Sequence, residues 1–252
     1  MNVVFVTGTA GAGKSLLTAS LISWYHEKSQ NAITVNLDPG VLALPYEPDV
    51  DVRTMIDLQE LMSKYSLGPN GALVFASDLI ASKLPEIQDE IESSNPDFVV
   101  VDTPGQIELF AFRESGPFVA KSMRADSKAV LFLIDSLVAS TPTSFLSLLL
   151  LSTSVQLRMG LPLLQVLSKT DIAQNAKEIV GWSREASKFE RSLSETKSGD
   201  AYTFYSQIFR AIRKTTILTD VYPVSGYTRD GFIALVGELS RIAKGGEEFE
   251  EH

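Results

Sequence analysis

The chain has 252 residues, with 22 Lys and Arg against 31 Asp and Glu, and therefore a formal net charge of −9. This acidic balance argues against direct binding of nucleic acid, because contact with a phosphate backbone needs a basic face. The lack of cysteine excludes disulfides and thiolate chemistry, and two histidines, His26 and His252, are too few for a histidine metal cluster. The groups that remain for catalysis or ligand binding are carboxylates, Lys, Arg, hydroxyls and backbone amides.

Short hydrophobic runs alternate along the chain with longer mixed segments. The runs lack polar alternation, which is typical of strands covered on both faces. They are Asn2–Thr7, Ala32–Asn36, Phe98–Val101, Ala129–Ile134, Leu163–Leu167 and Val221–Val224. The expected helices are Ser15–Lys28, Leu79–Ser93, Thr143–Met159, Ala173–Leu193, Ala201–Thr215 and Gly231–Ala243. This alternation predicts a three-layer α/β fold, in which a mostly parallel sheet lies between helices.

No repeat, low-complexity block or flexible linker divides the chain, so we predict one domain over residues 1–246 and an acidic tail at 247–252. Residues 39–96 separate the second and third expected strands and are too many for a plain crossover, which indicates a functional insertion. The first residues form a hydrophobic run without a basic leader, so we expect a cytoplasmic protein.

Residues 136–157 carry no charged side chain and have the length of a membrane span, but Pro142 and many Ser and Thr interrupt them. We therefore expect no contact with a membrane. Within this stretch Phe145–Leu151 is hydrophobic around most of a helix and must be buried. Two alternatives remain open from the residues alone: burial in the chain's own core, or burial against a second subunit.

The segment Gly8–Ser15 satisfies the pattern G-x-x-x-x-G-K-[ST] between an expected strand and an expected helix. Glycines let backbone amides wrap a phosphate, and the helix N-terminus adds positive potential. Lys14 suits the β- and γ-phosphates of a nucleotide, and the Ser15 hydroxyl suits Mg²⁺. The residues expected to bind the phosphates are Gly11, Ala12, Gly13, Lys14, Ser15 and Leu16.

A carboxylate follows the expected strand Phe98–Val101, since the next residues are Asp102-Thr103-Pro104-Gly105. If this strand lies beside the first one, Asp102 comes close to the magnesium position. Gly105 would let its amide approach the γ-phosphate closely.

The segment Ser168-Lys169-Thr170-Asp171 differs in one residue from the guanine-reading pattern Asn-Lys-x-Asp. Asp171 can accept two hydrogen bonds from the N1–H and N2 amino edge of guanine, an edge that adenine does not offer. The Lys169 stem would lie against the face of the base. After the last expected strand, Ser225 or Gly226 could offer an amide to guanine O6. Incidental loop polarity remains the alternative for these residues.

In this order the motifs resemble those of guanine-nucleotide-binding P-loop proteins, and Gly68-Pro69-Asn70 in the insertion is similar to the loop that characterises the GPN-loop GTPases. Ser168 and Gly40 depart from the usual family pattern. Four further segments resemble the family: Asn36–Gly40, Pro45–Pro48, Asp51–Arg53 and Asp102–Glu108.

The resemblance implies Mg²⁺-dependent hydrolysis of GTP to GDP by a homodimer that acts as a nucleotide-dependent switch or assembly factor. It implies that Asn70 reaches the nucleotide site of the opposite subunit, and that Asp38, Gln106 and Glu108 gather around the lytic water. Lys14 would contribute to catalysis, and the metal would be held by Ser15, Asp38 and Asp102. Helix Phe145–Leu151 becomes a candidate interface, and a partner related to RNA polymerase is plausible by resemblance.

Simpler roles remain open for several of these residues. Asn70 could be a plain turn residue, Asp38 could form a turn before Pro39, and Glu108 could be a solvated helix residue. Arg53 could pair either with Asp51 or with a phosphate. The rival functions are a scaffold in which hydrolysis only resets the state, and, on motif content alone, an ATPase or a small-molecule kinase.

Overall fold

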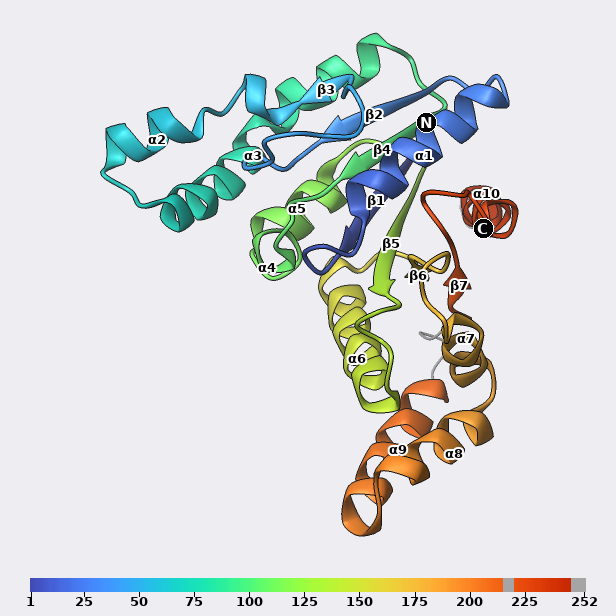
Figure 1. The fold of residues 1–252 in the computed structure, drawn as a ribbon. Helices are drawn as coiled ribbons and strands as arrows, with labels where there is room; N and C mark the ends of the chain where they lie inside the picture. Colours follow the sequence, from blue (N-terminus) through green and yellow to red (C-terminus); the bar gives the residue numbers. More distant parts are fainter. Residues whose placement is uncertain (215–219, 246–252) are drawn as a thin grey trace, which may run out of the picture.

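One parallel sheet organises the residues that the computed structural model describes, 1–214 and 220–245. Its seven strands lie in the order β3-β2-β4-β1-β5-β6-β7 (Figure 1). The strands are β1 (Asn2–Gly8), β2 (Ala32–Asn36), β3 (Val50–Asp51), β4 (Phe98–Asp102), β5 (Ser127–Asp135), β6 (Leu163–Ser168) and β7 (Tyr222–Pro223). Helices cover the sheet on both sides, so the expected three-layer α/β fold is confirmed, and each strand pair is parallel.

The helices are α1 (Lys14–Glu27), α2 (Leu58–Tyr65), α3 (Pro69–Ser93), α4 (Ile107–Phe110), α5 (Ser115–Ser122), α6 (Pro142–Met159), α7 (Ala176–Arg184), α8 (Ala186–Thr196), α9 (Gly199–Arg213) and α10 (Phe232–Gly245). The two faces of the sheet carry separate hydrophobic clusters. Val4 and Val6 of β1 belong to the cluster beneath α1 and α10, whereas Val3 and Phe5 belong to the cluster beneath α3, α5 and α6. Burial on both faces explains why the strands are hydrophobic throughout.

The carboxyl ends of the parallel strands meet along one edge of the sheet. Val6 of β1 lies beside Asp102 of β4, and Asp102 also lies beside Asn36 of β2. On the other side of β1, Asp135 at the end of β5 lies beside Ser168 at the end of β6. The loops that leave these ends carry the motifs of the sequence, as expected for an open parallel sheet with a ligand site at its carboxyl edge.

The insertion between β2 and β4 contains β3, a short 3₁₀ helix (Val52–Thr54), α2 and the long helix α3. Helix α3 begins at Pro69, ten residues before the expected start at Leu79, and Gly68 is its N-cap. Proline is well suited to the first helical position because its fixed φ matches a helix and its missing N–H is not needed there. Gly68-Pro69-Asn70 therefore forms the start of a helix.

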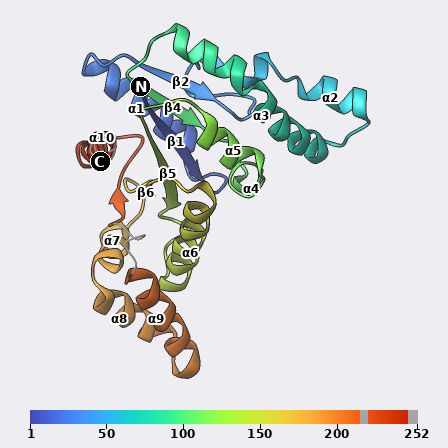
Figure 2. The ribbon, with the colours of Figure 1, turned by 180° about the vertical axis from the view of Figure 1, so that it is seen from behind.

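The expected single helix Ala173–Leu193 is wrong, because the chain forms two helices that part at Glu185. This residue has φ −129° and ψ 111°, an extended conformation that interrupts the helical hydrogen bonds. Helices α8 and α9 extend to the end of the molecule opposite α2 (Figures 1 and 2). The expected helix end at Thr215 and the acidic tail at 247–252 lie outside the described residues.

Helix α6 is largely buried by its own chain. Phe145, Leu146, Leu148 and Leu149 are between 0% and 7% exposed, which confirms for them the alternative of burial in the chain's own core. The expectation that the whole segment Phe145–Leu151 forms a subunit interface is therefore wrong for these four side chains. Within the segment, Leu150 points outward and is 42% exposed. None of the described helices is long and apolar enough to cross a membrane.

Candidate functional site

The phosphate loop joins the end of β1 to the start of α1. Gly13 has φ +92°, a left-handed conformation that favours glycine, and α1 begins at the next residue. The first turn of α1 has no acidic side chain, so its positive potential is available to an anion. The buried Lys14 ammonium donates hydrogen bonds to the carbonyls of Gly8 (3.1 Å), Thr9 (3.1 Å) and Gly105 (3.0 Å). The Lys14 ammonium thus joins the phosphate loop to the loop that follows β4.

Asp102 lies next to this cation and is 2% exposed. Burial lowers the pKa of Lys14, and the carboxylates of Asp102 and Asp38 oppose that shift. Burial likewise raises the pKa of Asp102, while the Ser15 and Tyr46 hydroxyls and the Lys14 charge favour its ionised form. The structure therefore brings Lys14, Ser15 and Asp102 together, as the sequence predicts.

The two oxygens of the Asp102 carboxylate differ in their contacts. Oδ2 accepts a hydrogen bond from the Tyr46 hydroxyl at 3.0 Å, whereas buried Oδ1 has no hydrogen-bond partner in the described part of the chain. A buried carboxylate oxygen without a partner calls for a ligand, and an oxygen donor beside the Ser15 hydroxyl suits Mg²⁺ or one of its water ligands. No group of three or more His, Cys, Asp or Glu suited to a metal occurs within residues 1–214 and 220–245.

Asp38 connects the loop after β2 to the loop after β4. Its Oδ1 accepts a hydrogen bond from the Gly40 amide at 2.9 Å, and its Oδ2 accepts one from the Gly105 amide at 2.8 Å. The Asp38 amide in turn donates to Asn36 Oδ1 at 3.0 Å. Asp38 thus forms a turn at Pro39, the simpler role left open for it, and it also contacts the amide that we expect to approach the γ-phosphate.

Three further residues to which the resemblance gives a part in catalysis, Gln106, Glu108 and Asn70, are exposed. Gln106 is the N-cap of α4 without a capping hydrogen bond, and the Glu108 side chain faces solvent in the first turn of α4. Asn70 is exposed in the first turn of α3. No hydrogen bond joins any of these three side chains to Lys14, Asp38 or Asp102 among the residues that the structure describes.

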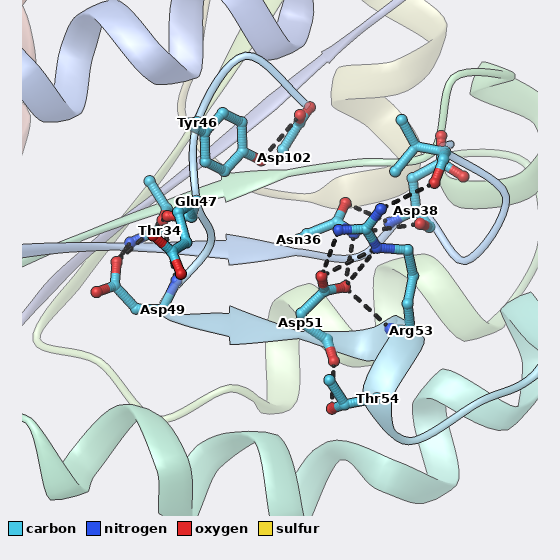
Figure 3. A network of polar contacts seen from close by, with 11 residues as sticks. Thr34, Asn36, Asp38, Tyr46, Glu47, Asp49, Asp51, Arg53, Thr54 and Asp102 are labelled. Atoms are coloured by element: carbon cyan, nitrogen blue, oxygen red, sulfur yellow. Dashed lines mark hydrogen bonds and ion pairs between the residues drawn. The ribbon is translucent and has the colours of Figure 1, made fainter. Parts of the chain in front are cut away.

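Arg53 is engaged by the insertion itself (Figure 3). Its guanidinium pairs with both carboxylate oxygens of Asp51, at 2.9 Å from Nε to Oδ2 and 2.6 Å from Nη2 to Oδ2, with a further Nε contact to Oδ1 at 3.0 Å. Asp51 also accepts a hydrogen bond from Asn36 at 2.9 Å, and Arg53 donates to the Val41 carbonyl at 3.0 Å. Of the two roles open to Arg53, the structure shows the pair with Asp51, which holds the start of the loop after β2.

A cavity of about 290 Å³ lies beside the phosphate loop, and most of the residues expected to read the base line it. Asp171 is exposed at this cavity, so its carboxylate is accessible to a ligand. Tyr227 and Ile172 are 81% and 59% exposed and add large apolar side chains to the lining. Of the predicted nucleotide-binding residues, the lining includes Ala12, Gly13, Leu16, Ser168, Lys169, Asp171 and Gly226.

Ser225 does not line the cavity, because it forms the turn after β7. Its amide donates to the Asp230 carbonyl at 3.1 Å, and its hydroxyl accepts hydrogen bonds from the amides of Tyr227 and Thr228 at 3.2 and 3.0 Å. Any amide offered to guanine O6 from this turn must therefore come from another residue, such as Gly226.

The loop after β6 is held by two residues that sequence reasoning missed, Asp135 and Ser136. Asp135 Oδ2 accepts a hydrogen bond from the Lys169 ammonium at 2.7 Å, and Ser136 donates to the Lys169 carbonyl at 3.1 Å. Lys169 has φ +59°, a left-handed conformation that is uncommon for a residue with a side chain. These contacts stabilise that conformation. Because Asp135 ends β5 beside β6, its place at a strand end is the signal that could have identified it.

Comparison with known proteins identifies relatives of the whole folded region. Residues 6–244 match the family described as "Conserved hypothetical ATP binding protein". The chain is 32% identical to GPN-loop GTPase PAB0955 of Pyrococcus abyssi, over 92% of this chain and 93% of that protein. The crystal structure of PAB0955, described as a GTPase in apo form, has a TM-score of 0.79 and covers 96% of this chain and 97% of its own, at 29% identity.

Several eukaryotic relatives are longer. The chain is 31% identical to GPN-loop GTPase QQT2 of Arabidopsis thaliana, over 92% of this chain and 62% of that protein. The corresponding match to GPN-loop GTPase 1 of Saccharomyces cerevisiae is 30% identical and covers 63% of that protein. The chain thus spans somewhat less than two thirds of the length of these two relatives.

Proposed function

Because this chain belongs to the family of GPN-loop GTPases, we propose that it binds GTP with Mg²⁺ and hydrolyses it to GDP and inorganic phosphate. One observation carries the proposal: the cavity that contains Asp171 is also lined by Ala12 and Gly13 of the phosphate loop. A single ligand with a base at one end and phosphates at the other matches both parts of this site.

Guanine is favoured over adenine by the carboxylate of Asp171. An exposed carboxylate at the cavity can accept hydrogen bonds from N1–H and the 2-amino group of guanine, whereas adenine presents an acceptor at N1 and no 2-amino group. Adenine nucleotides are the second candidate, because the matched family is described as ATP binding. The two candidates differ in one measurable property, the ability of ATP to displace bound GTP.

On the phosphate side, Lys14 and the backbone amides of the loop would stabilise the charge that develops during phosphoryl transfer. Ser15 and Asp102 would hold Mg²⁺, and Asp38 is proposed to act on the metal through water. The metal, when bound, supplies additional positive charge to the phosphate oxygens.

Asp38 is our first choice for the residue that orients the lytic water, with Gln106 next and Glu108 after it. The support comes from the hydrogen bond between the Gly105 amide and Asp38 Oδ2. A backbone amide has one hydrogen, so contact of the Gly105 amide with a γ-phosphate would release Asp38 Oδ2. The released oxygen would then be an acceptor close to the phosphate. Water alignment would thereby depend on the presence of the γ-phosphate.

We further propose that two copies of the chain act together and that Asn70 of each approaches the nucleotide of the other. An exposed polar side chain at the start of α3, without a hydrogen bond to its own phosphate loop among the described residues, supports this role. Leu150, exposed on α6, is a candidate for the subunit contact.

The biological role that we propose is a nucleotide-dependent switch or assembly factor in the cytoplasm, with a partner related to RNA polymerase. In the alternative role, a scaffold, hydrolysis only resets the bound state. A third possibility is a housekeeping enzyme that hydrolyses GTP without a partner. Turnover that rises strongly when a partner is added would favour the switch, and substantial turnover by the chain alone would favour the housekeeping enzyme.

Equilibrium binding of a fluorescent GTP analogue in magnesium buffer tests the central proposal. Unlabelled GTP and GDP should displace the analogue, ITP should displace it less well because it lacks the 2-amino group, and ATP should displace it poorly. Phosphate release from GTP should require magnesium. If ATP displaced the analogue as well as GTP does, adenine nucleotides would be the favoured ligands. If neither nucleotide bound, the proposal would be overturned.

A further inference from the structure

The segment Pro45–Pro48 resembles a family motif, and its contribution to the site is the contact between Tyr46 and Asp102. It lies in the loop between β2 and β3, and Tyr46 is its central aromatic residue. Figure 3 shows the Tyr46 ring directed from this loop toward Asp102 at the end of β4. The hydroxyl donates a hydrogen bond to Asp102 Oδ2 at 3.0 Å. Residues 56 positions apart in the chain are joined by this contact.

The hydrogen bond fixes the orientation of a buried carboxylate. A carboxylate can rotate about its Cα–Cβ and Cβ–Cγ bonds, and in Asp102 one oxygen is held by Tyr46. The other oxygen, Oδ1, is buried without a partner among the described residues. It is therefore the oxygen that remains available to a metal ion or to one of its water ligands. The phenol also donates to the ionised form of the carboxylate, which is the form that binds a cation.

The loop is itself restrained on both sides of Tyr46 (Figure 3). Pro45 and Pro48 limit the backbone angles next to the tyrosine. After it, Asp49 Oδ2 accepts hydrogen bonds from the amide (2.8 Å) and the hydroxyl (3.0 Å) of Thr34 in β2. Before it, Arg53 holds the Val41 carbonyl. The phenol is therefore presented to Asp102 by a loop that is fixed at both ends.

We propose that Tyr46 is a positioning residue for the magnesium site, which holds Asp102 so that Oδ1 faces the metal or one of its water ligands. This inference rests on the proposed function, since it assumes that Asp102 serves Mg²⁺. Groups that hydrogen-bond to a metal ligand set its orientation, and their removal typically weakens metal binding by about 10- to 100-fold.

The test is a magnesium titration of nucleotide binding. Fluorescent, non-hydrolysable GTP is bound to Tyr46→Phe and to the unchanged protein, first in EDTA and then at increasing Mg²⁺. The half-saturating Mg²⁺ concentration should rise by about 10-fold or more in Tyr46→Phe. Affinity in EDTA should stay within about twofold, because Tyr46 is assigned to the metal ligand and not to the nucleotide.

Tyr25→Phe is the matched control. Tyr25 is also buried, but its hydroxyl has no hydrogen-bond partner among the described residues, so the same atom is removed without loss of a contact. Its magnesium dependence should equal that of the unchanged protein. Thr34→Val is a second variant, which loosens the loop while it keeps the phenol, and it should raise the half-saturating Mg²⁺ by a smaller factor.

An unchanged magnesium dependence in folded Tyr46→Phe overturns the inference. So does an equal loss of affinity with and without Mg²⁺, which would make Tyr46 a general support of the fold or of the nucleotide. If Tyr46→Phe unfolds at a clearly lower temperature than the unchanged protein, Thr34→Val replaces it in the test, and an unchanged magnesium dependence in Thr34→Val then overturns the inference. Failure of the proposed function is distinct: the unchanged protein would then show no nucleotide binding, or none that responds to Mg²⁺.

Discussion

Replacement of Asp135 by Asn should weaken the binding of every nucleotide that the cavity accepts, without a change in base preference. The Asp135 side chain is 9% exposed and holds the Lys169 ammonium at 2.7 Å, while the Lys169 side chain is 30% exposed. Asparagine keeps the shape and can still accept the hydrogen bond that the Leu137 amide donates to Oδ1 at 2.9 Å. What is lost is the negative charge that holds the lysine.

The size of the effect follows from the freedom that Lys169 regains. If its stem covers the base, the ligand must immobilise it in the variant, which costs about 0.5–1.5 kcal/mol for a side chain of this kind. Since about 1.4 kcal/mol corresponds to tenfold in affinity, GTP, GDP and ITP should each bind about 2- to 10-fold more weakly. Fluorescence titration measures this, and Asp78→Asn is the control, because it breaks another aspartate–cation pair, with Arg113, that does not line the cavity. Unchanged affinity in Asp135→Asn, or an altered preference among bases, would refute the reasoning.

Three further substitutions separate the parts of the site. Lys14→Ala should abolish GTP binding, because it removes the buried ammonium at the phosphate loop, and undiminished binding in a filter assay would exclude that role. Asp171→Asn should weaken the preference for guanine over xanthine, since an amide can donate to the xanthine 2-oxo group, and competition by XTP measures it. Asn70→Ala should lower steady-state phosphate release by more than it lowers GTP affinity, and equal turnover would remove Asn70 from catalysis.

The sheet and the phosphate loop could be predicted from sequence because their signals are local. Strands buried on both faces, such as β4, read as uninterrupted hydrophobic runs, and a glycine pattern ending in Lys14-Ser15 fixes the helix start. Strand β3, at Val50–Asp51, has only two residues and offers no such run. The interruption at Glu185 also lacks a sequence signal, because no proline or glycine stands at or next to it, and Gly181 lies inside α7.

The supporting residues of the site escaped prediction for a different reason. Tyr46 contacts Asp102 across 56 positions, and Asp135 contacts Lys169 across 34. Neither pair shares a motif, so nothing in the local pattern joins them. The two cases are unequal, however, since Asp135 lies at a strand end where a charged residue is a candidate for the site in any parallel sheet. Tyr46 lies in a loop whose path only the folded chain reveals.

Ser168 illustrates how a departure from the usual pattern can keep the site intact. Its hydroxyl donates to the Ala12 carbonyl at 2.8 Å and so joins the loop after β6 to the phosphate loop. A serine hydroxyl has a single hydrogen to donate, and here it serves the connection between the two loops. Asp171 is not involved in that connection and stays exposed at the cavity. The position of the loop and the recognition of the base thus depend on different side chains. The presence of Ser168, where the usual pattern has Asn, therefore leaves the proposed guanine contact of Asp171 available.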